Sequence, residues 1–360
     1  MYKILVLNLG ATSTKVALFQ DEQCIDERVI RHTPEELAKC TSSEQQLEYR
    51  NRLVLAWLAE INEHMDEISA VTIRGAKMPR RICGGTFEVK GAYAEDLLNL
   101  YEPDKPLIHG ARITLPLAYR LIGDREIPIF VTDPPCTNEL TEIAEISGNA
   151  LYKRDVIFHA LNQKEAARRA CAELGVAYTQ ARLIVAHMGG GVSVGAHDCG
   201  RVVDVNNCVQ GEGPFSPERC GKINAVKIID ACFSGSYTHQ EMISQIQGNG
   251  GVKSYLGTAD MREVEERALA GDQQAERVFQ AMAYNIGKEI GAMYAVLHGQ
   301  VNAIVLTGGI AHSRRMTDLI KAMVSGFAPV KEYPGEFESE ALVNGALRIL
   351  RGEEPLQNYG

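Results

Sequence analysis

The chain has 360 residues and a formal net charge of −9; 45% of its residues are hydrophobic and 23% are charged. This length is typical of a two-domain globular enzyme, and the acidic balance argues against an extended nucleic-acid-binding surface. No apolar run reaches the length of a membrane span, and nine cysteines without C-x-x-C pairs or metal-ligand spacing indicate a reducing cytoplasm with neither a disulfide framework nor a zinc site.

The N-terminal segment begins directly with a strand and shows no signal-peptide pattern. KILVLNLGATSTKVALF forms two apolar strands around a glycine-rich turn, and residues 23–31 continue as a third strand. A helix with an N-cap and an early proline follows. Within it, Leu53, Ala56, Trp57 and Ile61 lie at helical spacing and predict one buried stripe.

Two further strands deliver polar residues to the same edge of the predicted sheet. Residues 68–75 and 127–135 are short apolar runs, and Arg74 and Asp133 stand at or near their C-terminal ends. Open α/β sheets place ligand groups at that edge. Residues 139–174 then read as a largely helical connection between domains.

The second half of the chain repeats this alternation. RLIVAHMGGGVSVGAHDCGRVVDVN, at residues 182–206, again places a glycine-rich turn between two apolar strands. One or two long helices follow within residues 260–299. Residues 303–313 form a buried strand that runs into a glycine pair, and residues 338–354 form a final amphipathic helix. Strands that alternate with helices predict the α/β class.

The two glycine-rich constructions superpose along the sequence. The alignment that matches their apolar runs places Asn8 on His187 and Gly10 on Gly189. This correspondence predicts a duplicated fold in which each half supplies one glycine turn. The alternative is a pair of unrelated β-hairpins, because glycine turns between apolar runs are common.

Three familiar motifs are weak or absent. No Gly-x-x-x-x-Gly-Lys-Ser/Thr sequence is present, and each glycine turn leads into a strand rather than a helix, which argues against P-loop and Rossmann sites. GVSVG at residues 191–195, with Asp260 and His298 downstream, matches a hydrolase nucleophile elbow. That elbow needs a helix directly after the serine, and here the following residues alternate like a strand.

The glycine turns themselves suit phosphate binding. Glycines allow consecutive backbone N–H groups to converge on phosphate oxygens. Hydroxyl and ammonium groups in the first turn add donors, and Asn8 at the strand end is placed to reach a phosphate or a metal-bound water. We therefore predict a phosphate site at Gly10, Thr12, Ser13, Lys15, Gly189, Gly190 and Gly191, with Gly308 and Gly309 against the ribose or adenine.

The chain resembles butyrate kinase and the branched-chain fatty-acid kinases, which belong with acetate and propionate kinases. The resemblance lies in NLGATSTKVALF, VIFHALNQK, VAHMGGGVSVGAHDCGRVVDVNN, GEGPFSPERCG, LGTADMREVE and LTGGIAHS, and covers essentially the whole chain. It implies a duplicated RNase H-like fold of the actin-like ATPase type, with two domains around an ATP cleft: residues 1–150 plus 341–360, and residues 151–340. It also implies ATP/ADP and Mg²⁺ as cofactors, a small carboxylate substrate, and a homodimer or larger homo-oligomer.

The resemblance further implies roles for single residues. Arg74 matches the arginine that binds the substrate carboxylate, and Asp133 matches an essential aspartate. His159 and Arg219 match residues that stabilise the transition state. The remaining matches are Asn8 and Glu340 for Mg²⁺; His187, Gly189, Gly190 and Gly191 for the phosphates; Asp260, Arg262, Gly308, Gly309 and Ser313 for the nucleotide; and Phe158 and Ala76 for the acyl pocket.

The chemistry of such a reaction explains the predominance of cations. A carboxylic acid with a pKa of about 4–5 is ionised at neutral pH, so its phosphorylation needs positive charge and positioning rather than a general base. On this ground Asp133 would hold Mg²⁺ or orient an arginine. The chain departs from the family at Ala11, where serine is usual, and at IRGA (residues 73–76), where the family has Gly-Arg-Gly-Gly. The first departure bears on nucleotide affinity and the second on acyl-chain specificity.

The sequence thus predicts a reversible, ATP-dependent kinase that makes an acyl phosphate from a short-chain fatty acid. Butyrate is the expected acid. The alternatives are a kinase for isobutyrate, propionate or acetate, and a non-catalytic nucleotide-binding protein of the same fold.

Overall fold

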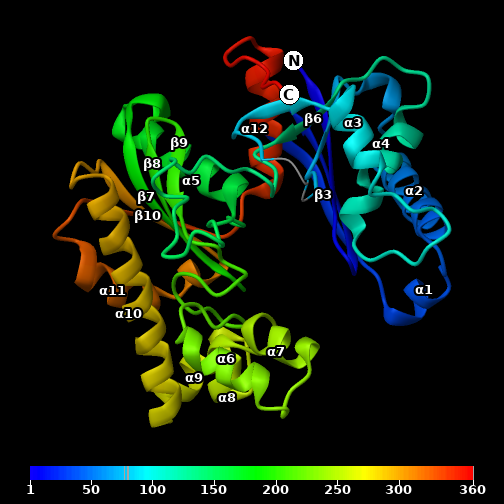
Figure 1. The fold of residues 1–360 in the computed structure, drawn as a ribbon. Helices are drawn as coiled ribbons and strands as arrows, with labels where there is room; N and C mark the ends of the chain where they lie inside the picture. The colour runs from blue at the N-terminus through cyan, green and yellow to red at the C-terminus, as the bar shows by residue number, and fades with distance from the viewer. Residues whose placement is uncertain (77, 79–80, 360) are drawn as a thin grey trace. The chain divides into compact units, whose positions relative to one another are not determined.

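The computed structural model describes residues 1–76, 78 and 81–359, and the chain divides into two units (Figure 1). The first unit comprises Met1–Thr137 and Glu338–Gly360, and the second comprises Asn138–Phe337. The chain changes unit after Thr137 and after Phe337, earlier than the positions 150 and 340 expected from the resemblance. Each unit is built on one β-sheet.

The first unit holds a six-stranded mixed sheet with the order β3-β2-β1-β4-β6-β5. α12 covers one face of this sheet, and α2 and α4 cover the other (Figure 1). β1 pairs antiparallel with β2 and parallel with β4. The elements are β1 (Lys3–Leu9), β2 (Ser13–Gln20), β3 (Gln23–Arg31), α1 (Pro34–Ala38), α2 (Ser43–Glu60), β4 (Ala70–Ile73), β5 (Thr86–Glu88), α3 (Ala92–Leu98), α4 (Thr114–Ile122), β6 (Ile129–Thr132) and α12 (Glu338–Leu350).

The buried stripe of α2 differs from the predicted one. Trp57 is buried as expected, but Ala56 is exposed. The stripe instead includes Leu47, Arg50 and Val54, which share the core side of the helix with Trp57. The charged residue Arg50 therefore occupies a core position that the hydrophobic pattern of the sequence did not predict.

The second unit holds a five-stranded sheet with the order β11-β10-β7-β8-β9. Its strands are β7 (Arg182–Met188), β8 (Val192–Asp198), β9 (Arg201–Val205), β10 (Ala303–Gly308) and β11 (Val330–Pro334). Its α-helices are α5 (Ala160–Leu174), α6 (Ala225–Phe233), α7 (His239–Ile246), α8 (Gly251–Leu256), α9 (Met261–Leu269), α10 (Gln273–Val296) and α11 (Arg314–Val324).

Both faces of the second sheet are covered, because successive residues of a strand point to opposite faces. Leu183 and Val185 of β7 pack in the cluster on the α5 side. Ile184 and Ala186 pack in the larger cluster formed with α10 and α11. A strand that is buried on both faces reads as a continuous apolar run, which explains why LIVAHM lacks polar alternation.

The two sheets share one core topology, and the predicted duplicated fold is confirmed. β1 pairs with β2 and β4, and β2 pairs with β3; likewise β7 pairs with β8 and β10, and β8 pairs with β9. In this correspondence Asn8 and His187 occupy equivalent positions, one residue before the end of their strands.

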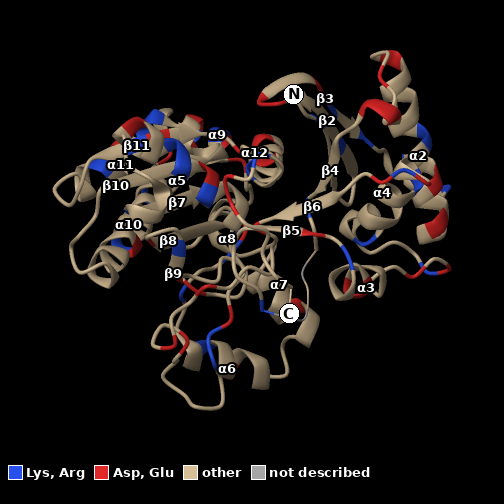
Figure 2. Ribbon diagram, turned by 90° about the horizontal axis from the view of Figure 1, so that it is seen from above, with Lys and Arg blue, Asp and Glu red and all other residues tan. Residues whose placement is uncertain are grey.

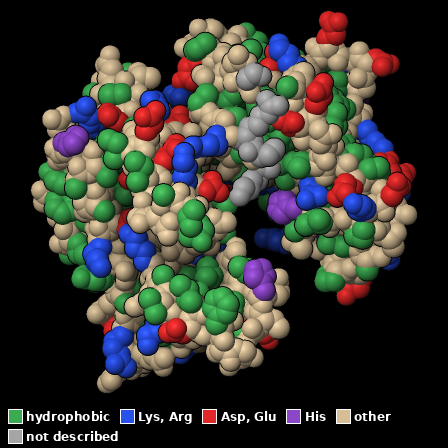
Figure 3. Space-filling view, in the orientation of Figure 1, with side chains coloured by type: hydrophobic (Ala, Val, Ile, Leu, Met, Phe, Trp, Pro, Cys, Tyr) green, Lys and Arg blue, Asp and Glu red, His purple; other side chains and the backbone are tan. Residues whose placement is uncertain are grey.

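Two segments of the second unit lie outside its core: the residues before α5, and helix α6. Residues 139–159 were predicted to be helical, but the helix begins only at Ala160. Turns at residues 142–145 and 150–151 and a bend at 148–149 occupy the segment, and Ile143 and Leu151 are exposed. α6 also contributes no buried residue, and its Phe233 is 87% exposed; Figure 3 shows hydrophobic side chains over this part of the second unit.

Acidic and basic side chains are interspersed along the helices of both units (Figure 2). Among the described residues, no helix combines the length and apolar character that crossing a membrane requires.

Candidate active site

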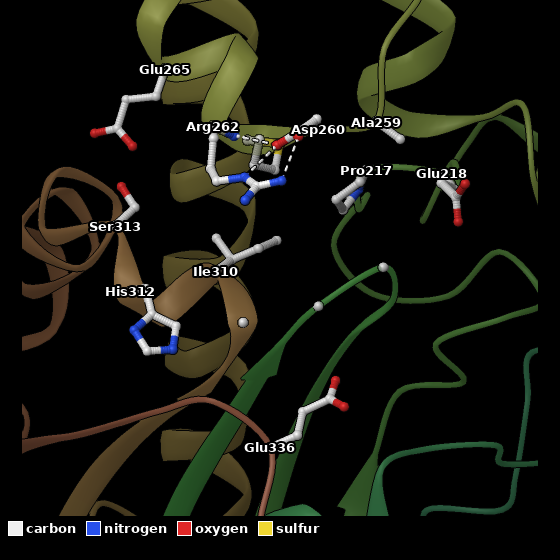
Figure 4. Close-up of a pocket in the computed structure, with 14 residues that line it drawn as sticks. Pro217, Glu218, Ala259, Asp260, Arg262, Glu265, Ile310, His312, Ser313 and Glu336 are labelled. Carbon is white, nitrogen blue, oxygen red and sulfur yellow. Dashed lines mark hydrogen bonds and ion pairs between the residues drawn. The ribbon is translucent and has the colours of Figure 1, made fainter. Parts of the chain in front are cut away.

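The second unit contains a cavity of about 880 Å³ at the end of β7 (Figure 4). Five segments distant in sequence form its walls: the glycine turn after β7, the loop at residues 217–218, the start of α9 with the residue before its N-cap, the turn between β10 and α11, and Glu336. A cavity of this size is in the range of small-molecule and cofactor sites. It is lined by Gly189, Gly190, Pro217, Glu218, Ala259, Asp260, Met261, Arg262, Glu265, Gly309, Ile310, His312, Ser313 and Glu336.

The lining thus brings together six residues predicted to contact nucleotide: Gly189, Gly190, Asp260, Arg262, Gly309 and Ser313. Asp260 caps the N-terminus of α9 and accepts hydrogen bonds from Arg262 through both carboxylate oxygens, at 2.8–3.1 Å. The Arg262 guanidinium lowers the pKa of Asp260 to about 2. Ser313 caps α11 through its hydroxyl.

Glycine is required at two positions around this cavity. A Cβ at Gly191 would lie 1.9 Å from Nη1 of Arg219, so the missing side chain lets the guanidinium approach the turn. Gly308 has a φ of +89°, and a Cβ there would lie 2.4 Å from the carbonyl oxygen of Met188. Gly308 therefore allows the ends of β7 and β10 to pack closely, and Gly191 leaves space for the Arg219 guanidinium at the turn.

Arg219 is held over the glycine turn by its own loop. Nη1 donates to the Cys208 carbonyl oxygen at 3.0 Å, and the Arg219 backbone N–H donates to Oγ of Ser216 at 3.2 Å. The Ser216 hydroxyl in turn donates to the Gly190 carbonyl oxygen at 2.7 Å. The structure thus brings together Arg219 and the glycine turn, both predicted as site elements.

His159 and His187, predicted separately, lie against each other. Their rings stack with centroids 3.8 Å apart and an interplanar angle of 15°. His187 lies beside two residues that line the cavity: a Cβ at Gly189 would lie 3.2 Å from its Nε2, and Oε1 of Glu336 lies 3.8 Å from the same nitrogen.

A buried hydrogen-bond chain reaches His159 through Gln163 and Ser193. Nε2 of Gln163 donates to both the carbonyl oxygen and Oγ of Ser193, at 3.0 and 2.7 Å. Oγ of Ser193 also lies 2.8 Å from Nδ1 of His159, and we assign the Ser193 hydroxyl as the donor of this hydrogen bond. Neutral His159 therefore carries its hydrogen on Nε2. Ser193, the serine of the GVSVG sequence, lies within β8 rather than before a helix, which excludes a nucleophile elbow.

The same chain continues into the core of the unit. Oε1 of Gln163 accepts from Nε2 of His197 at 3.1 Å, and the Tyr178 hydroxyl donates to Nδ1 of His197 at 2.8 Å. Burial, with a smaller effect of Lys164, lowers the pKa of His197 to about 3. His197 is therefore neutral at physiological pH and orients Gln163.

Phe158, predicted in the acyl pocket, packs in a small hydrophobic cluster with Leu140, Val156, Ala160, Val202 and Val205.

In the first unit, Asn8 and Arg74 meet at one carboxylate. Nδ2 of Asn8 donates to Oε2 of Glu338 at 2.7 Å, and Nε of Arg74 donates to Oε1 at 3.1 Å. Burial raises the pKa of Glu338, but Arg74, Asn8 and Lys15 outweigh it, so the pKa lies below its usual value. Arg74 Nη1 is buried and makes no hydrogen bond to any residue in the described part of the chain.

The carboxylate beside Asn8 is thus Glu338 and not the predicted Glu340. Two residues apart on α12, the two side chains point in different directions. Glu340 instead lies close enough to Cys24 of β3 to help raise the pKa of that thiol, after burial and Glu27. The sequence analysis missed Glu338, although its position as the first residue of the final helix could have pointed to it.

The donor set at Glu338 suits a phosphate-borne Mg²⁺ better than a dedicated metal cage. One carboxylate and one amide are present, and the described residues contain no cluster of three or more His, Cys, Asp or Glu side chains placed to hold a metal. Mg²⁺ commonly binds through one or two carboxylates while keeping waters and substrate phosphates as its other ligands. The residues therefore fit a metal that arrives with a nucleotide.

Asp133 lies at the end of β6 in a strained conformation. Its φ is +41°, which is uncommon for a residue with a side chain. Gly85 holds it there: the Gly85 N–H donates to Oδ1 at 2.7 Å, and the Asp133 N–H donates to the Gly85 carbonyl oxygen at 2.9 Å. The C-terminal tail supports Gly85, since a Cβ there would lie 2.7 Å from Cγ of Gln357.

The other predicted residues of the first unit lie at the turn and in the core. Gly10 and Thr12 form the turn between β1 and β2, and Ser13 opens β2. Lys15 pairs with Glu27 at 3.2 Å. Ala76 is buried in the core cluster of this unit.

Comparison with known proteins gives one family and one fold. The model of the acetokinase family matches residues 143–327, which is more than half of the chain. The structure is similar to acetate kinase from Porphyromonas gingivalis, with a TM-score of 0.77 and 18% identity over 97% of this chain and 100% of that one.

It is also similar to a propionate kinase from Francisella tularensis subsp. tularensis, with a TM-score of 0.70 and 17% identity over 96% of this chain and 99% of that one. Acetate kinase from Entamoeba histolytica matches with a TM-score of 0.72 and 13% identity over the same shares. At these identities the likeness shows the fold, and the predicted fold class is confirmed.

Proposed function

This chain belongs to the acetokinase family, and on that premise we propose that it transfers the terminal phosphoryl group of ATP to a short-chain carboxylate. One observation carries the proposal most directly. The Arg219 guanidinium lies over Gly191, at a turn that borders a cavity of nucleotide size and a stacked histidine pair. That arrangement supplies donors and positive charge where a phosphoryl group would sit.

The reaction needs positioning and charge neutralisation. The carboxylate oxygen forms a bond to the γ-phosphorus while the bond to the β–γ bridging oxygen breaks, and ADP leaves with that electron pair. The nucleophile is already ionised, so no proton has to be removed. Arg74 would bind the carboxylate, while Arg219 and the Nε2–H of His159 would donate to the phosphoryl oxygens.

The family uses ATP and Mg²⁺ in general, and we propose the same cofactors for this chain. Mg²⁺ would neutralise the phosphate charge that otherwise repels the carboxylate. Glu338 and Asn8 would hold it, in place of the Glu340 that the resemblance suggested. Asp133, tied to Gly85, would orient cations near Arg74 rather than act as a base.

We propose butyrate as the preferred acid, with isobutyrate, propionate and acetate as the alternatives. The residues that follow Arg74 support this preference less than the sequence suggested. A Cβ at Gly75 would lie 2.9 Å from Cγ1 of Val131, so the space beside Gly75 is filled. Ala76, which is buried in the core cluster of the first unit, remains the position at which a small side chain would leave room for the acyl chain. A cytoplasmic homodimer or larger homo-oligomer also remains part of the proposal, and light scattering of the purified protein tests the oligomer.

The test is release of ADP from MgATP in the presence of each straight-chain acid from two to six carbons. We expect turnover that depends on the acid and is highest with butyrate. Nucleotide binding without turnover on any acid would identify the chain as a non-catalytic nucleotide-binding protein instead.

A further inference from the structure

Arg50 is a fully buried cation that the proposed reaction does not use. Its residue surface is 0% exposed, and it lies on the core side of α2 between Leu47 and Val54. Burial of an isolated charge is costly unless it is hydrogen-bonded. The contacts of Arg50 therefore indicate what the buried charge stabilises.

Those contacts converge on the glycine turn between β1 and β2. Nη1 donates to the carbonyl oxygens of Gly10 and Ser13 at 3.0 and 2.8 Å, and Nη2 donates to the carbonyl oxygen of Ala11 at 3.1 Å. A further bond reaches Oγ1 of Thr14 at 3.2 Å. One guanidinium thus collects three carbonyl groups of a single turn.

The remaining carbonyl group of the turn is also used. The backbone N–H of His32 donates to the Thr12 carbonyl oxygen at 2.9 Å. The carbonyl oxygens of residues 10–13 are therefore all satisfied from within the protein. By contrast, the backbone N–H groups of Ala11 and Thr12 donate to none of the residues that the structure describes, and both residues are exposed. Such unpaired, neighbouring amides form an anion-binding nest.

No carboxylate compensates the charge of Arg50. Among the described residues it forms no ion pair, and Gln46, at 3.3 Å, is its remaining polar partner. Burial lowers the pKa of Arg50 to about 10, which leaves it charged at neutral pH. A positive charge therefore lies directly behind a turn whose free N–H groups already favour an anion.

We propose that Arg50 is a positioning residue that shapes the Gly10–Thr14 turn into a site for a phosphoryl dianion. It fixes the carbonyl groups inward, leaves the amides of Ala11 and Thr12 for the ligand, and adds an uncompensated positive charge behind them. The inference deepens the proposed function, on which the identity of the ligand depends. The dianion would be the terminal phosphate of ATP or the phosphate of an acyl phosphate.

Arginine is required for this role because of its shape. The planar fork reaches Gly10 and Ala11 through different nitrogens, whereas a lysine ammonium at the end of a flexible stem is a point charge. A lysine variant would therefore retain the charge but lose part of the turn geometry. This difference separates the two contributions of Arg50 experimentally.

His32 provides a readout at the turn itself. Its Nε2 lies 2.9 Å from Oγ1 of Thr14, and its ring packs edge-on against Tyr49. Burial lowers the pKa of His32, Arg50 lowers it further, and Glu36 opposes them. An anion at the turn would change the field at this ring. The resonance is assigned by its loss in His32→Gln.

The first experiment titrates inorganic phosphate into the full chain and follows the ¹⁵N resonances of His32. We expect a saturable shift in the wild type, binding about tenfold or more weaker in Arg50→Met, and an intermediate loss in Arg50→Lys. Arg52→Met is the matched control, because Arg52 is exposed on the same helix; it should bind phosphate like the wild type. Thermal unfolding confirms that each variant is folded.

Two results would overturn the proposal: a wild-type His32 that does not respond to phosphate, or a folded Arg50→Met that binds it as the wild type does. If Arg50→Met does not fold, Arg50→Lys decides, and wild-type phosphate affinity in that variant overturns the proposal.

A kinetic experiment then separates the two sources of the dianion. A rise in KM for MgATP alone in Arg50→Lys identifies the nucleotide phosphate, and a rise for acyl phosphate alone identifies the product phosphate. A rise for both identifies the group in transit, and no rise for either overturns the assignment to the reaction. If the wild type makes no acyl phosphate, the proposed function fails, while the His32 titration still decides the role of Arg50.

Discussion

His159 and His187 stack face to face, with ring centroids 3.8 Å apart and ring planes within 15° of parallel. Two charged imidazolium rings at this separation would repel each other. With the Ser193 hydroxyl as the donor to Nδ1, the neutral form of His159 carries its hydrogen on Nε2, and Oδ1 of Asn162 lies 2.8 Å from Nδ1 of His187. The pair thus places a hydrogen-bond donor and a second ring beside the glycine turn, since Nε2 of His187 lies 3.2 Å from where a Cβ of Gly189 would be.

Replacement of Ser193 by alanine should release the tautomer of His159. We expect kcat to fall about twofold, because His159 then presents its Nε2–H for only part of the time, whereas KM for MgATP should change little. ¹⁵N spectra of the imidazole should show a mixture of tautomers in the variant. An unchanged tautomer together with reduced kcat would mean that Ser193 acts on the reaction by another route.

Arg219 is expected to act on the transition state. Arg219→Ala should lower kcat by about 10²–10³, with a much smaller change in KM for MgATP. Gly191→Ala should reproduce part of this loss, because the new Cβ would occupy the position of Nη1. The double variant should be no worse than Arg219→Ala alone. Fully additive losses would show that Gly191 matters for some other reason.

Glu338 and Glu340 form a matched pair for testing the metal assignment. Glu338→Gln should raise the Mg²⁺ concentration needed for half-maximal activity by about tenfold or more, and it leaves Arg74 without its carboxylate partner. Glu340→Gln should behave like the wild type. The opposite result would restore Glu340 as the metal residue.

The ion pair between Arg74 and Glu338 predicts that the stability of the protein depends on pH. The pKa of Glu338 lies below its usual value of about 4.5 in the folded protein, so its stabilisation is present above that value and is lost as the pH falls through the lower folded pKa. The stability advantage of the wild type over Glu338→Gln should therefore shrink in acid. Urea unfolding at pH 7 and at pH 4 measures the difference, and an advantage that grows in acid would contradict this sign.

Ala76 tests the acid preference. Ala76→Val should shift kcat/KM from butyrate toward propionate and acetate, by about fourfold for each methylene excluded. Because Ala76 is buried in the core cluster, the variant should also lose about 1–3 kcal/mol of stability. An unchanged acid profile in a folded variant would remove Ala76 from the acyl pocket.

Much of the fold could be predicted because local pattern and tertiary structure agree in it. The apolar runs around both glycine turns were sufficient to predict β1–β2 and β7–β8, since a glycine-rich turn between two buried strands leaves few other structures. The segment before α5 failed because helical residues such as Glu and Leu occur there without a continuous apolar stripe. In such a segment the helix propensity of single residues is overridden by turns like the one at residues 142–145.

The site was harder to predict where its residues act through partners. Arg219 and the glycines carry recognisable motifs, so their types and spacing suggested phosphate chemistry. Glu338 and Arg50 carry none, and Gln163, although it lies in the VIFHALNQK segment, was assigned no role. Each is defined by what it contacts, and a charged residue on a helix such as α2 reads as solvent-exposed until tertiary packing shows it buried. The sequence alone cannot tell whether Glu338 or Glu340 faces Asn8, because that depends on the orientation of the first turn of α12.

The most direct test of the account is a hydroxylamine trap for acyl phosphate, with MgATP and acids of two to six carbons, in the wild type and in Arg219→Ala. We predict acyl hydroxamate from the wild type in proportion to ADP released, greatest with butyrate, and about 10²–10³ less from the variant. ADP release by the wild type without hydroxamate from any acid would contradict phosphoryl transfer to a carboxylate.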